Sequence, residues 1–159
     1  MKFSDAMASI KKEYNKKNPD LLFDPDRVID SVSSGDVIFD LVSGVGGFPR
    51  GRLTEIFGME GSCKSSLLYA SFAGIQRAKG FGILFDHENA FSAEYAEETF
   101  GLVVDNKTFA LIQPDNIEQG MEVFDKLTGG GDGKSEGLDA IDLIGFDSIE
   151  SMKPEAIIN

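Results

Sequence analysis

From residue 52 onward, short apolar runs alternate with segments of helical periodicity, and this alternation constrains the fold more than any other feature. The apolar runs that predict strands are RLTEIF (52–57), FGILFD (81–86), FALIQ (109–113) and IDLIGFD (141–147). The segments that predict helices are 65–78, 94–101 and 116–127. Strands that alternate with helices form parallel sheets covered on both faces, so we expect an α/β fold with a largely parallel sheet.

The chain before residue 52 predicts a separate leading helix. Ala6, Ile10 and Tyr14 recur at helical spacing with lysines between them, which indicates an amphipathic helix over 5–17. The helix should end before Pro19, because the residue before a proline is pushed out of the helical region. We therefore divide the chain into an N-terminal helix and linker over 1–30 and an α/β core over 31–159.

Composition limits the partners of the chain. Its 159 residues carry a net charge of −12, and affinity for nucleic acid depends mainly on Lys and Arg. The dense basic cluster Lys11, Lys12, Lys16 and Lys17 is more typical of the solvated face of a helix.

No apolar run approaches the roughly 18 residues of a transmembrane helix, and the single Cys63 fits a reducing compartment. We expect a cytoplasmic protein without a membrane partner.

The octapeptide GMEGSCKS lies between the predicted strand 52–57 and the predicted helix 65–78. It follows the phosphate-loop pattern G-x-x-x-x-G-K-[ST] except that Cys63 replaces the second glycine. In that context Lys64 would reach the outer phosphates and Ser65 would ligate magnesium. A glycine-rich turn with a chance lysine is the alternative. The cost of Cys63 depends on whether its position needs a positive φ, which the sequence does not reveal.

Two further predicted strands end in carboxylates, where parallel sheets bind their ligands. The strand 81–86 ends in Asp86 and is followed by His87 and Glu88, whereas 141–147 ends in Asp147. Glu88 could orient an attacking water, although spacing alone favours a solvated loop acid. Asp147 fits the Walker B pattern, in which a strand-end aspartate holds the magnesium shell. We expect His87 to be an exposed loop residue.

A second G-K-S, at Gly133, Lys134 and Ser135, does not have the same context. Thr128 stands in place of its first glycine, no strand precedes it and no apolar helix follows. We interpret 128–137 as a flexible surface loop.

Several motifs together resemble the ATPase core of RecA-type recombinases. They are SSGD, GVGGFPRGR, EIFGMEGSCKS, FDHENAFSAEYA, QPDNIEQGMEVFDKL and IGFDSIESM, and the resemblance spans nearly all of the chain. It implies a RecA-like P-loop NTPase core, and the leading helix resembles the one that contacts the adjacent subunit of a filament in that family. The departures from the usual pattern favour a phage member.

The resemblance also implies a site for ATP and Mg²⁺. Glu88 matches the glutamate that activates water, which reverses the interpretation from spacing, and Tyr95 matches the aromatic that stacks on adenine, with a helix tyrosine at the core edge as the alternative. The predicted catalytic residues are Glu88 and Lys64, and the predicted magnesium ligands are Ser65 and Asp147. The predicted nucleotide-binding residues are Gly58, Met59, Glu60, Gly61, Ser62, Cys63, Lys64, Ser65, Ser66, Ser92, Tyr95 and Asp147.

The sequence ends shortly after the Walker B pattern, before the part of the family that carries the DNA-binding loops and the remaining strands. We therefore expect an incomplete sheet, weak or no ATP hydrolysis, and contacts to single-stranded DNA mainly in a complete protein. The favoured function is the ATP-binding core of a DNA recombinase that acts in recombination and repair. The alternatives are a non-catalytic half-recombinase for filament assembly or capping, and a small-molecule kinase, for which no arginine-bearing lid is present.

Overall fold

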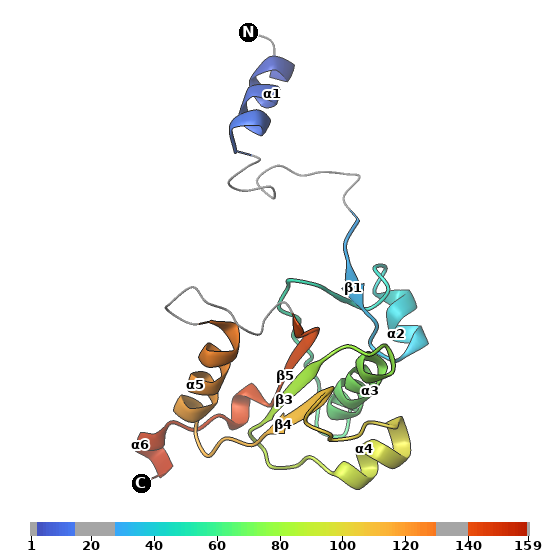
Figure 1. Cartoon of the computed structure of the whole chain (residues 1–159), viewed down its shortest axis with the longest axis vertical. Coiled ribbons are helices and arrows are strands. Elements are labelled where there is room, and N and C mark those ends of the chain that lie inside the picture. Colours follow the sequence, from blue (N-terminus) through green and yellow to red (C-terminus); the bar gives the residue numbers. More distant parts are fainter. Residues whose placement is uncertain (1–2, 15–27, 130–139, 159) are drawn as a thin grey trace.

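The computed structural model describes residues 3–14, 28–129 and 140–158 (Figure 1). The elements before the main sheet are α1 (Phe3–Tyr14), β1 (Ser31–Val32), α2 (Val37–Val42) and β2 (Phe48–Pro49). The main sheet and its helices comprise α3 (Lys64–Arg77), β3 (Gly82–Asp86), α4 (Ala93–Phe100), β4 (Phe109–Ile112), α5 (Ile117–Thr128) and β5 (Leu143–Asp147). A 3-10 turn, Ile149–Ser151, and the short helix α6 (Glu155–Ile158) follow.

The core is a parallel sheet of three strands in the order β4-β3-β5. The register pairs Phe85 with Phe146 and Asp86 with Asp147. The predicted parallel α/β architecture is therefore confirmed, and the two strand-end aspartates lie side by side at the carboxyl edge of the sheet.

Helices cover both faces of this sheet (Figure 1). On one face, the buried Phe72 of α3 packs with Leu84 and Phe109 in the main apolar cluster. On the other face, the ring of Phe146 stacks on Phe85 at 4.8 Å and contacts Phe124 of α5 at 5.7 Å. The alternation of side chains along β3 thus supplies apolar contacts to α3 and to α5 at successive residues.

Glycines in two strands allow α3 to lie close to the sheet. A Cβ at Gly82 would come within 2.4 Å of the Phe72 ring, and one at Gly145 would lie 3.1 Å from the same ring. The missing side chains make room for Phe72, which is 1% exposed. This packing holds the first turn of α3 near the carboxyl end of β5.

The segment 52–57, predicted as a strand, is not a strand in the structure. It has no regular secondary structure, and Leu53 and Phe57 are 95% and 86% exposed. A segment rich in residues that favour strands forms one only where the edge of a neighbouring strand pairs with its N–H and C=O groups. The main sheet contains only β4, β3 and β5 among the described residues, so the segment 52–57 does not join it.

The other predicted elements differ from the structure by at most two residues at the ends that the structure describes. α3, α4 and α5 occupy the predicted helical segments, and Gly101 ends α4 in the left-handed conformation with φ 71°. The leading helix begins at Phe3, whereas the predicted end of that helix falls outside the described residues. So does most of the loop 128–137, including its second G-K-S. DVIFDLVS forms α2, which Asp36 caps by accepting a hydrogen bond from the N–H of Phe39 at 2.7 Å.

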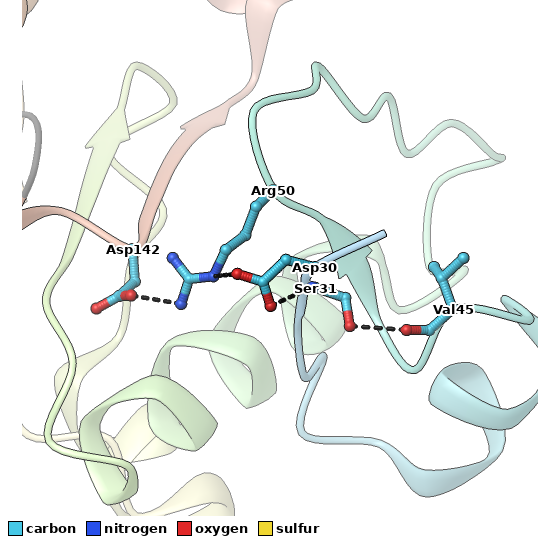
Figure 2. A network of polar contacts seen from close by, with 5 residues as sticks. All are labelled: Asp30, Ser31, Val45, Arg50 and Asp142. Carbon is cyan, nitrogen blue, oxygen red and sulfur yellow. Dashed lines mark hydrogen bonds and ion pairs between the residues drawn. The ribbon is translucent and has the colours of Figure 1, made fainter. Parts of the chain in front are cut away.

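An ionic network joins the β1–β2 hairpin to the amino end of β5 (Figure 2). The Arg50 guanidinium lies 2.6 Å from Asp142 and 3.4 Å from Asp30, and Asp142 also accepts the N–H of Phe81 at 2.9 Å. Burial alone would raise the pKa of Asp142, but the hydrogen bonds from Phe81 and Arg50 and the guanidinium charge bring it below its usual value. The network therefore fixes the hairpin at the edge of the sheet opposite to the strand-end carboxylates.

Helix α2 presents a large apolar surface to solvent. Its exposed side chains are Val37, Ile38, Leu41 and Val42, at 73–83% exposure. Among the described helices, none has both the length and the apolar character needed to cross a bilayer.

Candidate functional site

The glycine-rich loop leads directly into α3 and is folded around its own lysine. The N–H of Ser62 donates to the carbonyl of Met59 at 3.2 Å, which closes a turn. The Lys64 ammonium donates to the carbonyls of Gly58 and Met59 at 3.0 and 3.1 Å. The amides of the first turn of a helix have no partner within the helix and attract anions. The loop thus places one cation and a helix N-terminus together.

Cys63 has φ 63° and ψ 26°, which is the left-handed conformation. This answers the question that the sequence left open, because the position does require a positive φ. Gly61 also has a positive φ of 75°. Cys63 is exposed and caps α3 without a side-chain hydrogen bond to the helix. The loop therefore keeps its left-handed turn despite the missing glycine, at a conformational cost.

Ser65 and Asp147 are brought together at the start of α3. The Ser65 hydroxyl lies near the Asp147 carboxylate and favours its charged form, which lowers the pKa of Asp147. Burial nevertheless raises the pKa of Asp147 above its usual value, and the charges of Glu88 and Asp86 act in the same direction. A hydroxyl and a crowded carboxylate are the oxygen donors that Mg²⁺ binds. This pair fits a magnesium ion, whose charge would relieve the carboxylate repulsion.

Asp86 fixes the loop that follows β3. Its side chain is 2% exposed and accepts the N–H groups of Ala90 and Phe91 at 3.3 and 3.1 Å. The amide of Gln113, just after β4, donates to it at 2.9 Å. Three donors satisfy this buried carboxylate. Asp86 therefore shapes the loop that carries Glu88.

Glu88 lies at the surface and is held by two serines that follow β5. Its Oε1 accepts the hydroxyls of Ser148 at 2.6 Å and Ser151 at 3.0 Å. Asp147 directly precedes this pair, and its pKa responds to the charge of Glu88. The structure thus places Glu88 beside Asp147 and the first turn of α3.

Tyr95 of α4 contacts the first turn of α3. Its hydroxyl lies 3.2 Å from the Ser66 hydroxyl, and its ring is 44% exposed with an edge contact to Phe100 at 5.6 Å. Ser92 caps α4 by accepting the N–H of Tyr95 at 3.2 Å. Ser92 therefore acts locally to orient the helix that presents Tyr95.

Of the residues predicted for the site, the structure places Lys64, Ser65 and Glu88 around Asp147 at the carboxyl end of β5. It also places the hydroxyl of Tyr95 beside that of Ser66. The prediction for His87 was wrong. It was expected to be exposed, but it is half-buried because its ring occupies the space beside Gly120 and Pro114. The His87 Nε2 atom has no hydrogen-bond partner in the described part of the chain, and burial lowers the pKa of His87 while Asp86 opposes the shift.

Sequence reasoning missed Ser148, Ser151 and Tyr69. Tyr69 is 5% exposed beneath the site, and its burial, followed by the charge of Asp147, raises its pKa to about 12. A signal for the serines was present, because two hydroxyls follow the last predicted strand within four residues. Spacing alone did not indicate which group they contact.

The fold and site define the class of α/β proteins that bind ligands at the carboxyl edge of a parallel sheet. The sequence model of the family described as the RecA N-terminal domain matches residues 1–159. The chain belongs to this family.

Curated relatives agree with this assignment. The chain is 39% identical over 154 residues to Protein RecA of Corynebacterium aurimucosum, which covers 96% of this chain and 38% of that relative. It is 38% identical over 155 residues to Protein RecA of Corynebacterium jeikeium, which covers 97% of this chain and 38% of that relative. The chain therefore spans less than two fifths of the length of these relatives.

Proposed function

We propose that the glycine-rich loop binds the phosphates of ATP together with Mg²⁺. The single observation that carries this proposal is the arrangement at the start of α3. There the Lys64 ammonium lies against the loop carbonyls, and the Ser65 hydroxyl lies near the carboxylate of Asp147 at the end of β5. In a glycine-rich turn without a ligand, a lysine, a hydroxyl and a carboxylate are not expected together at one helix N-terminus.

Each residue then has a definite role in binding and hydrolysis. Lys64 leaves the loop carbonyls and neutralises the outer phosphates, while the exposed ring of Tyr95 stacks on the adenine. Ser65 and Asp147 hold Mg²⁺, which supplies charge neutralisation for the phosphates. Glu88 accepts a hydrogen bond from the attacking water and orients it.

Titration of the chain with Mg-ATP tests this proposal. Lys64→Ala should weaken binding at least about tenfold, because a charge-assisted contact to phosphate is lost. Lys107→Ala removes an exposed lysine on the loop before β4 and should leave the affinity unchanged. Failure of the wild type to bind, or equal binding by Lys64→Ala, would refute the assignment.

For the complete protein, we infer DNA recombination and repair as a nucleotide-dependent filament, with single-stranded DNA as the partner. The support is membership of the RecA N-terminal domain family. For this chain alone we expect weak or no hydrolysis of ATP and no stimulation by DNA. A clear acceleration of hydrolysis by single-stranded DNA would contradict that expectation.

Self-association is a second candidate function, and the exposed side chains of α2 favour it. Val37, Ile38, Leu41 and Val42 form an apolar surface on one short helix, and such surfaces mark sites of association. Sedimentation with and without Mg-ATP tests assembly with other copies of the chain. A monomer under both conditions would refute it, and Leu41→Glu should weaken any assembly that forms.

A further inference from the structure

We propose that Ser151, together with Ser148, is a positioning residue that holds the Glu88 carboxylate in the orientation needed to bind the attacking water. This inference rests on the proposed nucleotide site, and it assigns a function to the turn that follows β5.

The turn itself brings the two hydroxyls together. The N–H of Ser151 donates to the carbonyl of Ser148 at 3.2 Å, and the two hydroxyl oxygens lie 3.1 Å apart. Both hydroxyls then donate to the same atom, Oε1 of Glu88, at 2.6 and 3.0 Å. Two hydrogen bonds to one carboxylate oxygen hold the glutamate side chain in one rotamer. An exposed glutamate without such bonds samples several rotamers.

The hydrogen bonds from Ser148 and Ser151, here called the serine clamp, leave the other carboxylate oxygen of Glu88 available for the reaction. Within the described ranges, Oε2 of Glu88 has no hydrogen-bond donor, since the contacts of this side chain are those to the two serines. A carboxylate oxygen without a partner is free to accept a proton of water. Fixing Oε1 therefore determines the direction in which Oε2 points.

The two neighbouring carboxylates are less exposed than Glu88. Asp86 is buried and accepts hydrogen bonds from Ala90, Phe91 and Gln113, and Asp147 is half-buried near the Ser65 hydroxyl. Glu88 is thus the one of these three carboxylates that combines exposure with a free oxygen. This contrast supports Glu88 as the group that binds water.

The clamp also depends on the pairing of the sheet. Glu88 follows β3 and both serines follow β5, and the register pairs the last residues of these two strands, Asp86 and Asp147. A local role, in which Ser151 only stabilises its own turn, would not require the contact across strands. If Ser151 positions Glu88, its loss should affect only ligands that include the attacking water. If Ser151 only stabilises its own turn, its loss should not distinguish between ligands with and without that water.

The test compares the affinity for Mg-ADP with the affinity for Mg-ADP plus aluminium fluoride, which mimics the transferred phosphoryl group with its attacking water. It requires no turnover. Ser151→Ala removes one hydrogen bond to a charged group, so it should weaken binding of the fluoride complex by about 10- to 100-fold and leave Mg-ADP affinity unchanged. Ser151→Thr keeps a hydroxyl and should restore the wild-type affinity. Glu88→Gln should weaken the fluoride complex at least as much as Ser151→Ala.

Glu150→Gln is the matched control, because Glu150 is exposed on the same turn. It should change neither affinity. If Mg-ADP does not bind to the wild type, the proposed function fails and this inference fails with it. If Mg-ADP binds, three results overturn the inference alone: fluoride fails to tighten wild-type binding, Ser151→Ala weakens both ligands equally, or it weakens neither.

Discussion

Replacing Cys63 with glycine should stabilise the chain, even though it enlarges the conformational freedom of the unfolded state. Cys63 has φ 63° and ψ 26°, and a residue with a Cβ pays about 1–2 kcal/mol in the left-handed region. Its side chain offers little in return, since its one hydrogen bond is a 4.0 Å contact from Sγ to the carbonyl of Gly61.

The expected gain is the difference between two opposing effects. Glycine removes the left-handed penalty, but its greater freedom in the unfolded chain costs about 0.5–1 kcal/mol. The thiol is exposed, so its removal adds no buried cavity. Cys63→Gly should therefore raise the free energy of unfolding by about 0.5–1 kcal/mol.

Urea unfolding of three variants checks this reasoning. Cys63→Ala keeps the Cβ and removes the thiol, so its stability should match the wild type within about 0.5 kcal/mol. Ser62→Gly is made at a neighbouring loop position that is not among the positive-φ residues, and it should lose about 0.5–1 kcal/mol. The reasoning is refuted if Cys63→Gly is no more stable than the wild type, or if Cys63→Ala gains as much as Cys63→Gly.

Further predictions concern the packing of α5 and the network of Figure 2. A Cβ at Gly120 would lie 2.9 Å from the His87 ring, so Gly120→Ala should destabilise the chain by about 1 kcal/mol, whereas in a His87→Ala background the better helix propensity of alanine should stabilise it. Urea unfolding of the two pairs checks this reversal of sign. Because burial lowers the pKa of His87, the unfolded chain binds more protons below about pH 6.5, and the stability contributed by this group should fall as the pH drops through that region. His87→Ala should flatten this slope, and an unchanged slope would contradict the assignment. Arg50→Ala leaves the partly buried Asp142 without its cation and should cost about 1 kcal/mol after allowance for solvent exposure. Arg52→Ala, at an exposed residue, should change stability by less than about 0.5 kcal/mol, and equal losses for the two arginines would count against the network.

The sequence predicted the parts of the fold in which local pattern and tertiary pairing agree. The apolar runs of β3, β4 and β5 and the periodic helices between them were identified with small errors at their ends. The strand expected at 52–57 failed for a physical reason: strand formation depends on a partner edge, which no local pattern encodes. The structure also adds α2, which was not among the predicted helices and whose apolar side chains face solvent.

The candidate site shows a similar division. Motif spacing identified Lys64, Ser65 and Asp147, and the resemblance added Glu88, because each is tied to a strand end or a helix start. The contacts of Ser148 and Ser151 with Glu88 join two strands, so they emerge only from the register of the sheet. The left-handed backbone conformation of Cys63 likewise depends on how the loop closes. The residue type gives no sign of it, because a residue with a Cβ disfavours that conformation.

The most direct test of the nucleotide site is the rate at which Cys63 is alkylated with and without Mg-ATP. Cys63 is the single cysteine of the chain and is exposed in the loop, so the label reports this position alone. We predict that saturating Mg-ATP slows alkylation of the wild type and has little effect on Lys64→Ala. An alkylation rate that is the same with and without Mg-ATP in the wild type would contradict the account.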